Sequence, residues 1–509
     1  MNDTAAGRYD RDLAAPPAIV VPSATGVDAR IVIAGPGARA IAFVLDWLIR
    51  TALALAWLLA AAFAILGDLD FNVGPDDEVL WYLVAAMPAT AIYFLYHLIL
   101  EPVLNGRTPG KRMAGLRVLT PEGVVPSIGA LITRNVFRIV DSMPVLYVVG
   151  LLFVMFGKRH ARLGDLAAGT VVAVERAPFL EKLDAERGVP AKHRQWREAR
   201  EHAAALGRRH GSDVRDALRV IGDYREAARA LGHARTSRAP DAARSAEHLE
   251  AVYSDLHDVI HRPARRLGQE VLTLFRERVP LALSRMRLHL LAVTMLFIVS
   301  GVTGWWLVFT YPDLIAMFAD PKLIATVERG ELWTDGLLNV TPSAVLSVSI
   351  LTNNVVVSIF AFCSGVVFGL GTFYLVGLNG LSLGAIFAFT GQHGLAGRLF
   401  DFVIAHGCVE LSCICIAGAA GAFVGEALIR PGERTRADAF RAAAGDGVLV
   451  LVAVTLLLIV CGLIEGFISP DPEIPRWARV TIGVGYFLFM ISFLRGHVFG
   501  RTRARIAGL

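Results

Sequence analysis

The chain has 509 residues, of which 55% are hydrophobic and 19% are charged, with a formal net charge of +5. Several windows of about 18 or more nearly uncharged residues exclude a soluble globular protein, because soluble core helices are shorter and amphipathic. The composition therefore predicts an all-α polytopic membrane protein. Residues 1–28 are expected to form a disordered tail, and the acids and prolines near the start indicate no cleavable signal peptide.

Residues 29–178 form a first predicted membrane module with spans at 37–66 and about 79–100. The loop GDLDFNVGPDDE between them has five acids and no bases, whereas NGRTPGKRMAGLRV after the second span has four bases and no acids. Basic loops stay in the cytoplasm, so we expect the N-terminus inside and the acidic loop outside.

The rest of this module combines a predicted helical hairpin with small cytoplasmic strands. The hairpin is expected over 128–142 and 144–157, broken at Pro144, because the Arg-rich segment that follows must return to the cytoplasm. GLRVLTPEGVV and GTVVAVE are typical of short strands, and we expect them to pair with ARIVIAG at 29–35.

Residues 179–285 are predicted to be a cytoplasmic helical linker. Two stretches place apolar residues three to four positions apart with charges opposite, which indicates amphipathic helices that form an antiparallel bundle or lie on the membrane. Acids are interspersed among the arginines, so no nucleic-acid partner is expected.

Residues 286–497 form a larger second module, followed by a basic cytoplasmic tail at 498–509. The 380–392 span is too short to cross about 30 Å of hydrocarbon, so a half-helix after a sharp Asn379–Gly380 turn is expected. Together with the two spans of the first module, the six spans of the second give about eight full or near-full spans, and the helical hairpin is additional. The six spans of the second module are predicted at about 286–309, 350–376, 380–392, 400–428, 447–468 and 478–496.

Charged residues recur within the first module's apolar segments. Arg39 and Asp46 are seven positions apart and share a helical face, and three charges near 134–141 share another. A charge at membrane depth costs at least about 2.5–3.5 kcal/mol, so such groups pair inside the protein. Either an ion-pair network or a path for an ion or solute is expected from Arg39, Asp46, Arg134, Arg138, Asp141 and Asp165.

The order of motifs ARxxAxxxD, TPGKRMAGLRV, LxxRNxxRxxD and RLGDLAAGTVV resembles the RDD family of bacterial membrane proteins over residues 29–176. The family is named for one arginine and two aspartates, and the resemblance assigns these to Arg39, Asp46 and Asp165. Sodium–proton antiport is one activity that it implies.

Polar residues of the second module are expected to converge in the outer half of the membrane. With the predicted topology, His406 lies about 8 Å and Glu410 about 14 Å below the outer end of the fourth span. Glu465 lies near the outer end of the fifth span, and Asn353 and Asn354 lie in the first turn of the second.

Three interpretations of this cluster remain open. His406, Glu410 and Cys413 share a helical face, so together with Glu465 they could bind a metal ion. This metal site is the weaker interpretation, because the HExxH motif is absent. Intramembrane His and Glu residues also form proton or ion relays in transporters. A structural hydrogen-bonded cluster is the third interpretation.

The motifs LTNNVVVSIFAFCSGVVFGLGT, GLNGLSLG and HGCVELSCICIAGAAG resemble the stage II sporulation protein M family over about 190–497. The resemblance implies a membrane fold and, for the named protein, work in a peptidoglycan-remodelling assembly. The chain is thus expected to be a fusion of two family modules in the bacterial inner membrane, with both termini cytoplasmic.

We expect a non-enzymatic protein that moves an ion or small solute and has no cofactor. A scaffold for envelope or peptidoglycan-remodelling proteins is the first alternative, and a metal-dependent intramembrane hydrolase is a weaker one. The lipid bilayer is the expected partner. The five cysteines, all in apolar segments, are expected to be small buried residues. The sequence does not predict the oligomeric state.

Overall fold

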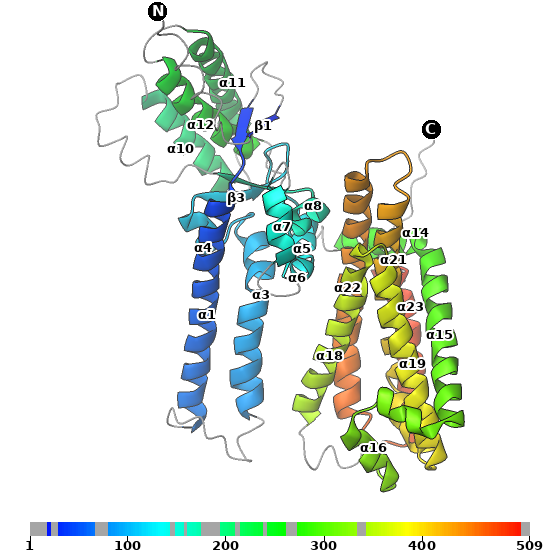
Figure 1. The fold of residues 1–509 in the computed structure, drawn as a ribbon. Helices are drawn as coiled ribbons and strands as arrows, with labels where there is room; N and C mark the ends of the chain where they lie inside the picture. Colours follow the sequence, from blue (N-terminus) through cyan, green and yellow to red (C-terminus); the bar gives the residue numbers. More distant parts are fainter. Residues whose placement is uncertain are drawn as a thin grey trace, which may run out of the picture. The chain divides into compact units, whose positions relative to one another are not determined.

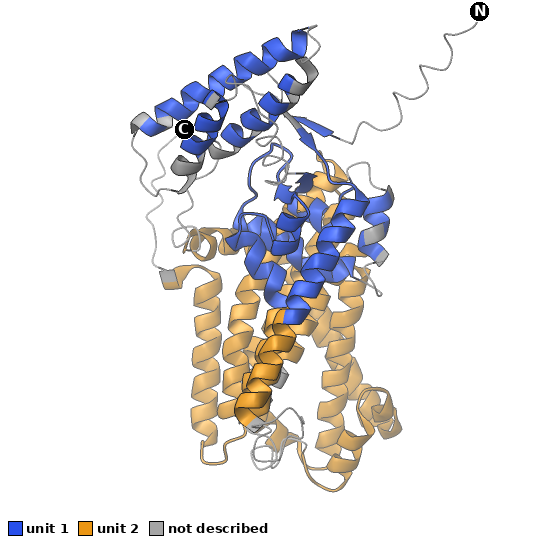
Figure 2. Ribbon diagram, turned by 90° about the vertical axis from the view of Figure 1, so that its left-hand side faces the viewer, with its two compact units in different colours: residues 1–52, 94–264 blue, residues 53–93, 265–509 orange. Residues whose placement is uncertain are grey.

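The computed structural model describes most of the chain, and its elements are drawn in Figure 1. Its residues form two compact units, 1–52 with 94–264 and 53–93 with 265–509 (Figure 2). The described residues are 18–21, 29–66, 80–142, 148–156, 160–174, 194–208, 214–237, 242–260, 272–332 and 343–499.

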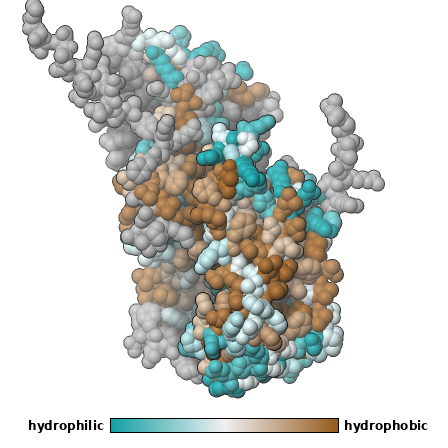
Figure 3. Space-filling view, turned by 45° about the vertical axis from the view of Figure 1, so that its right-hand side comes forward, coloured by the Kyte–Doolittle hydropathy of each residue, from teal (hydrophilic) through white to brown (hydrophobic). Residues whose placement is uncertain are grey.

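The membrane-length helices confirm an all-α polytopic membrane protein. On the face drawn in Figure 3, hydrophobic side chains cover much of the surface and hydrophilic ones gather in separate areas, one of them at the bottom of the view. By length and composition, seven helices in the described ranges can cross a membrane: Pro36–Ile65, Trp81–Val103, Arg287–Thr310, Leu370–Gln392, Gly407–Ile429, Arg436–Phe467 and Arg476–Leu494.

The two spans predicted for the first module are present. Helix α1 covers Pro36–Leu66, and the π-helix η1 (Trp81–Ala86) continues into α3 (Met87–Val103). The residues of both spans are divided between the two units.

The expected hairpin is instead a series of short helices. Helix α5 (Ile128–Val136) ends at Phe137, α6 (Arg138–Asp141) is a single turn, and α7 (Val148–Phe156) has nine residues. Nine residues extend only about 14 Å, which is too short to cross the hydrocarbon. Residues 143–147, including the predicted break at Pro144, lie outside the described residues. Two further short helices are α4 (Pro109–Met113) and α8 (Leu163–Ala168).

The predicted strands do pair. Strand β3 (Leu116–Leu119) lies antiparallel to β4 (Val171–Val174), and an isolated bridge joins Ile33 to Ala173. Strand β2 (Ala29–Val32) also pairs with β1 (Ala18–Val21), which lies within the tail expected to be disordered.

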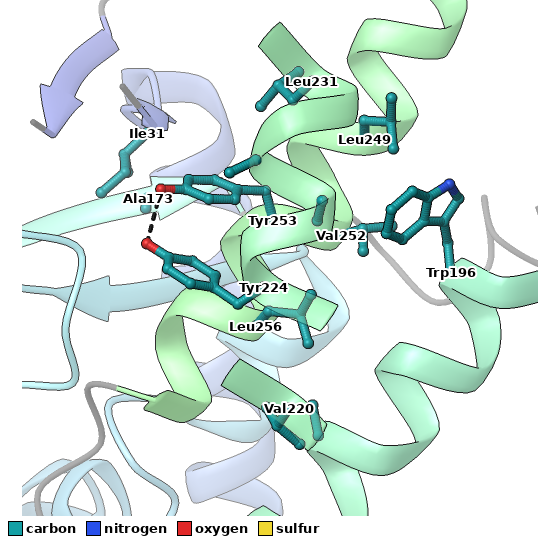
Figure 4. Packing of buried hydrophobic residues seen from close by; sticks show 13 residues of the cluster. Ile31, Ala173, Trp196, Val220, Tyr224, Leu231, Leu249, Val252, Tyr253 and Leu256 are labelled. Carbon is teal, nitrogen blue, oxygen red and sulfur yellow. Dashed lines mark hydrogen bonds between the residues drawn. The ribbon is translucent and has the colours of Figure 1, made fainter. Parts of the chain in front are cut away.

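The helices of the predicted linker form a bundle, which is one of the two arrangements expected. It has three helices, α10 (Arg194–Arg208), α11 (Val214–Thr236) and α12 (Ala242–Ile260), and belongs to the first unit. Its buried core joins Ile31 of β2 and Ala173 of β4 (Figure 4). The bundle therefore shares a hydrophobic core with the strands of the first module. It is not an independent linker.

In the second unit, α21 contacts α15, α18, α19, α22 and α23, and most of its residues are buried. Besides its share of α1, η1 and α3, the described helices of this unit are η3 (Leu274–Arg278), α14 (Val279–Arg285), α15 (Arg287–Thr310), η4 (Pro312–Met317), α16 (Pro321–Glu328), α18 (Ser343–Cys363), η5 (Ser364–Val366), α19 (Leu370–Gln392), α20 (Ala396–Val403), α21 (Gly407–Ile429), α22 (Arg436–Phe467), α23 (Arg476–Leu494) and η6 (His497–Phe499).

The short third span of the second module was wrongly predicted. Helix α19 has 23 residues and crosses Asn379–Gly380 without a break. Asn379 donates its side-chain amide to Leu375 O at 2.8 Å, so it is accommodated inside the helix. The chain turns earlier, at Phe368 and Gly369, where φ is 52° and 81°.

The predicted fourth span, 400–428, is also divided. Helix α20 ends at Val403 and α21 begins at Gly407, so His406 precedes α21 with φ −132° and ψ −32°. A Cβ at position 407 would lie 2.3 Å from Val403 Cγ1, so an alanine there would require the Val403 side chain to shift. The break places His406 at the entrance to α21, one turn before Glu410.

Candidate functional site

Glu101, which the sequence analysis missed, is the centre of the first module's charge network. It is fully buried at the end of α3 and accepts from Lys111 Nζ at 2.7 Å and Arg134 Nη1 at 2.6 Å. Asn135 Nδ2 donates to it at 2.9 Å. The available signal was an acid in the last turn of an apolar span, followed ten residues later by a lysine.

Asp46 is held by three segments that meet around the middle of α1. It accepts from Tyr96 Oη at 3.0 Å, Thr108 Oγ1 at 2.5 Å and the Gly110 backbone N–H at 2.8 Å. Lys111 Nζ lies 3.9 Å away. Burial lowers the pKa of Lys111 to about 8, although the carboxylates of Glu101 and Asp46 favour its charged form.

Asp165 joins α8 to α1 and α5. Arg39 Nη1 donates to it at 3.0 Å and Arg134 Nε at 2.7 Å. Burial raises the pKa of Asp165, but the guanidinium groups of Arg134, Arg39 and Arg162 outweigh burial and hold that pKa below its ordinary range. Arg39 and Asp165, which the RDD resemblance singled out, are thus direct partners.

Asp141 and Arg138 lie in α6. Asp141 is buried and accepts from the backbone N–H groups of Leu163 at 3.0 Å and Gly164 at 3.4 Å, with Arg162 Nε 3.4 Å away. Arg138 is half-buried, and its positive charge acts on Glu101.

Each buried acid of the network has a basic partner. Ion pairs join Asp46, Glu101, Asp141 and Asp165 with Arg39, Lys111, Arg134 and Arg162, and Arg138 adds a further positive charge that acts on Glu101. Removing one partner of such a close pair would leave an unpaired buried charge, which is strongly destabilising. The network is therefore best interpreted as a structural brace that holds the helices of the first module together.

The second cluster brings together His406, Glu410 and Glu465. His406 Nε2 lies 3.7 Å from Glu410 Oε2 and 3.6 Å from Glu465 Oε1. His406 and Glu465 are buried, with 2% and 8% of their surface exposed, and Glu410 is half-buried. These residues come from the break before α21, the first turn of α21 and the end of α22.

Two groups hold the His406 residue in place. Its Nδ1 lies 2.9 Å from Ser469 Oγ, and Cys461 Sγ donates to its backbone carbonyl at 3.6 Å. Ser469 follows the end of α22, so α22 and its exit turn set the direction of the imidazole. The sequence analysis did not identify this serine.

The asparagines of α18 differ in their roles. Asn354 is buried and its side chain lies beside Glu410, whereas Asn353 is exposed and donates its side-chain amide to Asn354 Oδ1 at 3.4 Å. Asn353 therefore supports the cluster without reaching either carboxylate.

Cys413 is fully buried but is not among the three ligand-bearing residues that converge. The other cysteines were expected to be small buried residues, and this is wrong for Cys408, which is exposed, whereas Cys363, Cys415 and Cys461 are buried.

An apolar cavity of about 780 Å³ in the second unit is lined by the other face of α21, including Cys408, Leu411 and Ser412. Helices α14, α15 and α23 complete its wall, and none of the three converging residues lines it. The cavity is therefore separate from the histidine–glutamate cluster.

The long apolar helices and the buried charges between them define a multi-pass membrane protein. Residues 33–169 match the RDD family model, and residues 293–470 match the model of stage II sporulation protein M. One chain therefore carries matches to both families, in the order of the two predicted modules. No curated protein and no solved structure matches it.

Proposed function

We propose that this protein moves a cation across the bacterial inner membrane through the cluster of His406, Glu410 and Glu465, without catalysing a reaction. One observation carries the proposal. Two carboxylates share a largely buried site with one imidazole, and among the described residues no arginine or lysine forms an ion pair with either carboxylate.

Physical chemistry requires a positive partner at such a site. Buried carboxylates are strongly unfavourable unless they are paired, protonated or bound to a cation. In the first module, basic side chains neutralise the buried carboxylates. In the second module, a bound proton or cation must neutralise Glu410 and Glu465. Unbalanced ionisable residues within membrane helices are typical of ion pathways.

We further propose that both termini and the Arg430–Arg436 turn face the cytoplasm. The turn carries the arginines of IRPGERTR, and the opposite ends of the same helices carry the acids Asp471 and Glu473. The positive-inside rule then puts the cluster near the outer face, because Glu465 lies near the end of α22 that is distant from this turn.

Transport is tested in proteoliposomes that contain a pH-sensitive dye, with Na⁺, K⁺, Mg²⁺ or Mn²⁺ added outside in separate trials. We expect the wild type to change the internal pH with at least one cation, and Glu410→Gln and Glu465→Gln to abolish the change.

Glu426→Gln is the matched control, because Glu426 is an exposed acid on the same helix as Glu410 and pairs with His289 at 2.7 Å. It should transport like the wild type. Undiminished flux in a folded Glu410→Gln/Glu465→Gln double variant would refute the proposal. Absence of flux with every cation would favour the scaffold function instead.

A further inference from the structure

Three potential metal-ligand atoms meet at one point of the second unit. His406 Nε2, one oxygen of Glu410 and one oxygen of Glu465 all lie within 4.8 Å of one another. They come from two parts of the chain, because His406 and Glu410 are one turn apart at the start of α21 and Glu465 lies near the end of α22.

The distances fit shared coordination better than direct hydrogen bonds. N–H···O hydrogen bonds are about 2.7–3.2 Å long, shorter than the 3.6 and 3.7 Å from His406 Nε2 to the two carboxylates. Ligands about 2.1 Å from a tetrahedral metal ion lie about 3.4 Å apart. The three separations are at most 4.8 Å, so the ligand atoms must approach one another by up to about 1.4 Å to occupy three corners of such a shell.

The orientation of the imidazole points to the same conclusion. If Nδ1–H donates to Ser469 Oγ at 2.9 Å, Nε2 presents a lone pair toward two carboxylates. Three acceptors that face one another repel unless a cation lies between them. Metal-bound histidines commonly hold their second ring nitrogen in such a hydrogen bond.

Glu465 supplies an independent observation. Its second oxygen, Oε2, is buried and has no hydrogen-bond partner among the described residues. An unsatisfied buried carboxylate oxygen costs free energy. A bound metal ion satisfies that oxygen directly or through a coordinated water.

We propose that His406, Glu410 and Glu465 bind one divalent transition-metal ion, with Ser469 as the positioning residue. One imidazole and two carboxylates suit Mn²⁺, Fe²⁺, Co²⁺ or Zn²⁺ better than alkali ions or Cu⁺. Three protein ligands leave coordination positions open for exchange. The inference rests on the proposed function only in taking this ion as the transported cation.

The full-length protein in detergent is first treated with a chelator and then titrated with Co²⁺. Binding is measured at equilibrium from the visible absorption of the bound Co²⁺. Bound metal is then counted by elemental analysis after gel filtration. The wild type should bind one ion per chain, and both Glu465→Gln and His406→Asn should abolish that binding.

Two further variants separate loss of a ligand from loss of the fold. Ser469→Ala keeps all three ligands and should weaken Co²⁺ binding about 10–100-fold. Cys413→Ala removes a buried residue outside the cluster and should leave the affinity unchanged. A wild type that binds no Co²⁺, or Co²⁺ binding that survives Glu465→Gln and His406→Asn, would overturn the inference.

The binding and transport results are separable. Metal binding without flux of any cation would refute the proposed transport and support the site. A proton flux that depends on Glu410 and Glu465, in a protein that binds no Co²⁺, would support transport and overturn the metal site.

Discussion

Buried charges in this chain are neutralised in two different ways. Glu101 of the first unit contacts both an ammonium and a guanidinium group, so its charge is balanced within the protein. Among the described residues, the basic group that pairs with Glu465 of the second unit is an imidazole, at 3.6 Å. The first arrangement stabilises one conformation, and the second leaves a place for an exchangeable cation.

Glu101→Gln should destabilise the first unit by about 3–5 kcal/mol, because Lys111 and Arg134 then lose a buried carboxylate partner. The free energy of unfolding is measured by denaturant titration in detergent. Glu122→Gln, at an exposed turn, is the control and should change it by less than about 0.5 kcal/mol. Equal stability of the two variants would contradict the structural role that we assign to the charge network around Glu101.

Asp165→Asn should lower stability at neutral pH, and the deficit should vary with pH in a defined direction. The pKa of Asp165 is lowered in the folded protein, so its stabilisation is present above the unfolded pKa of about 3.9. The stabilisation is lost as the pH falls further, through the folded pKa.

Unfolding of the wild type and of Asp165→Asn is therefore compared at about pH 7, pH 5 and pH 3.5. The difference should be constant between the first two values and smaller at the third. A difference that stays the same between about pH 5 and about pH 3.5 would show that the pKa of Asp165 is not lowered.

Among the helices, glycines determine how closely α15 and α19 approach. A Cβ at Gly384 would collide with Gly301 O, and one at Gly380 would lie 2.6 Å from Phe297 O. Small residues permit such contacts between membrane helices, where dispersion and packing replace the hydrophobic effect. The same packing explains why Asn379–Gly380 continues a helix where a turn was expected.

Gly384→Ala should destabilise the second unit by about 1–3 kcal/mol, because the added methyl group forces α15 and α19 apart. Gly377→Ala on the same helix is the matched control, since nothing lies within 4 Å of its Cβ position. Thermal unfolding in detergent should show a lower midpoint for the first variant only. A lower midpoint for both would point to a backbone effect of α19.

For the whole chain, the proposed topology makes the ends of the second unit chemically distinguishable. Lys322 begins α16 and Glu433 lies in the turn after α21, and both are exposed. Of the native cysteines only Cys408 is exposed, so the Cys408→Ser variant has no exposed native cysteine that would react with a maleimide.

In that background, Lys322→Cys should react with a membrane-impermeant maleimide in spheroplasts, whereas Glu433→Cys should react only after permeabilisation. The positive-inside rule is the physical reason, because arginines surround Glu433. The opposite labelling pattern would invert the topology and put the histidine–glutamate cluster near the cytoplasmic face.

Parts of both clusters could be predicted, and their omissions have physical causes. Arg39, Asp46 and Asp165 were identified because charges in apolar segments are conspicuous. Glu101 was missed because it ends its span, where an acid is ordinarily solvated. Glu410 and Glu465 were brought together by topology and helical rise alone, whereas Ser469 carries no signal that distinguishes it from other serines.

Hydrophobic length and loop charge, which are local properties of the chain, were enough to indicate the membrane class, the two modules and most helices. These properties were not enough to predict which strands pair or where a helix breaks, because both depend on contacts between distant residues. The break between α20 and α21 falls inside one apolar stretch of the sequence, and α19 packs through its glycines against α15. Whether a buried carboxylate has a basic side chain as its partner also depends on the folded chain. Glu101 contacts Arg134, whereas the basic group near Glu465 is the His406 imidazole.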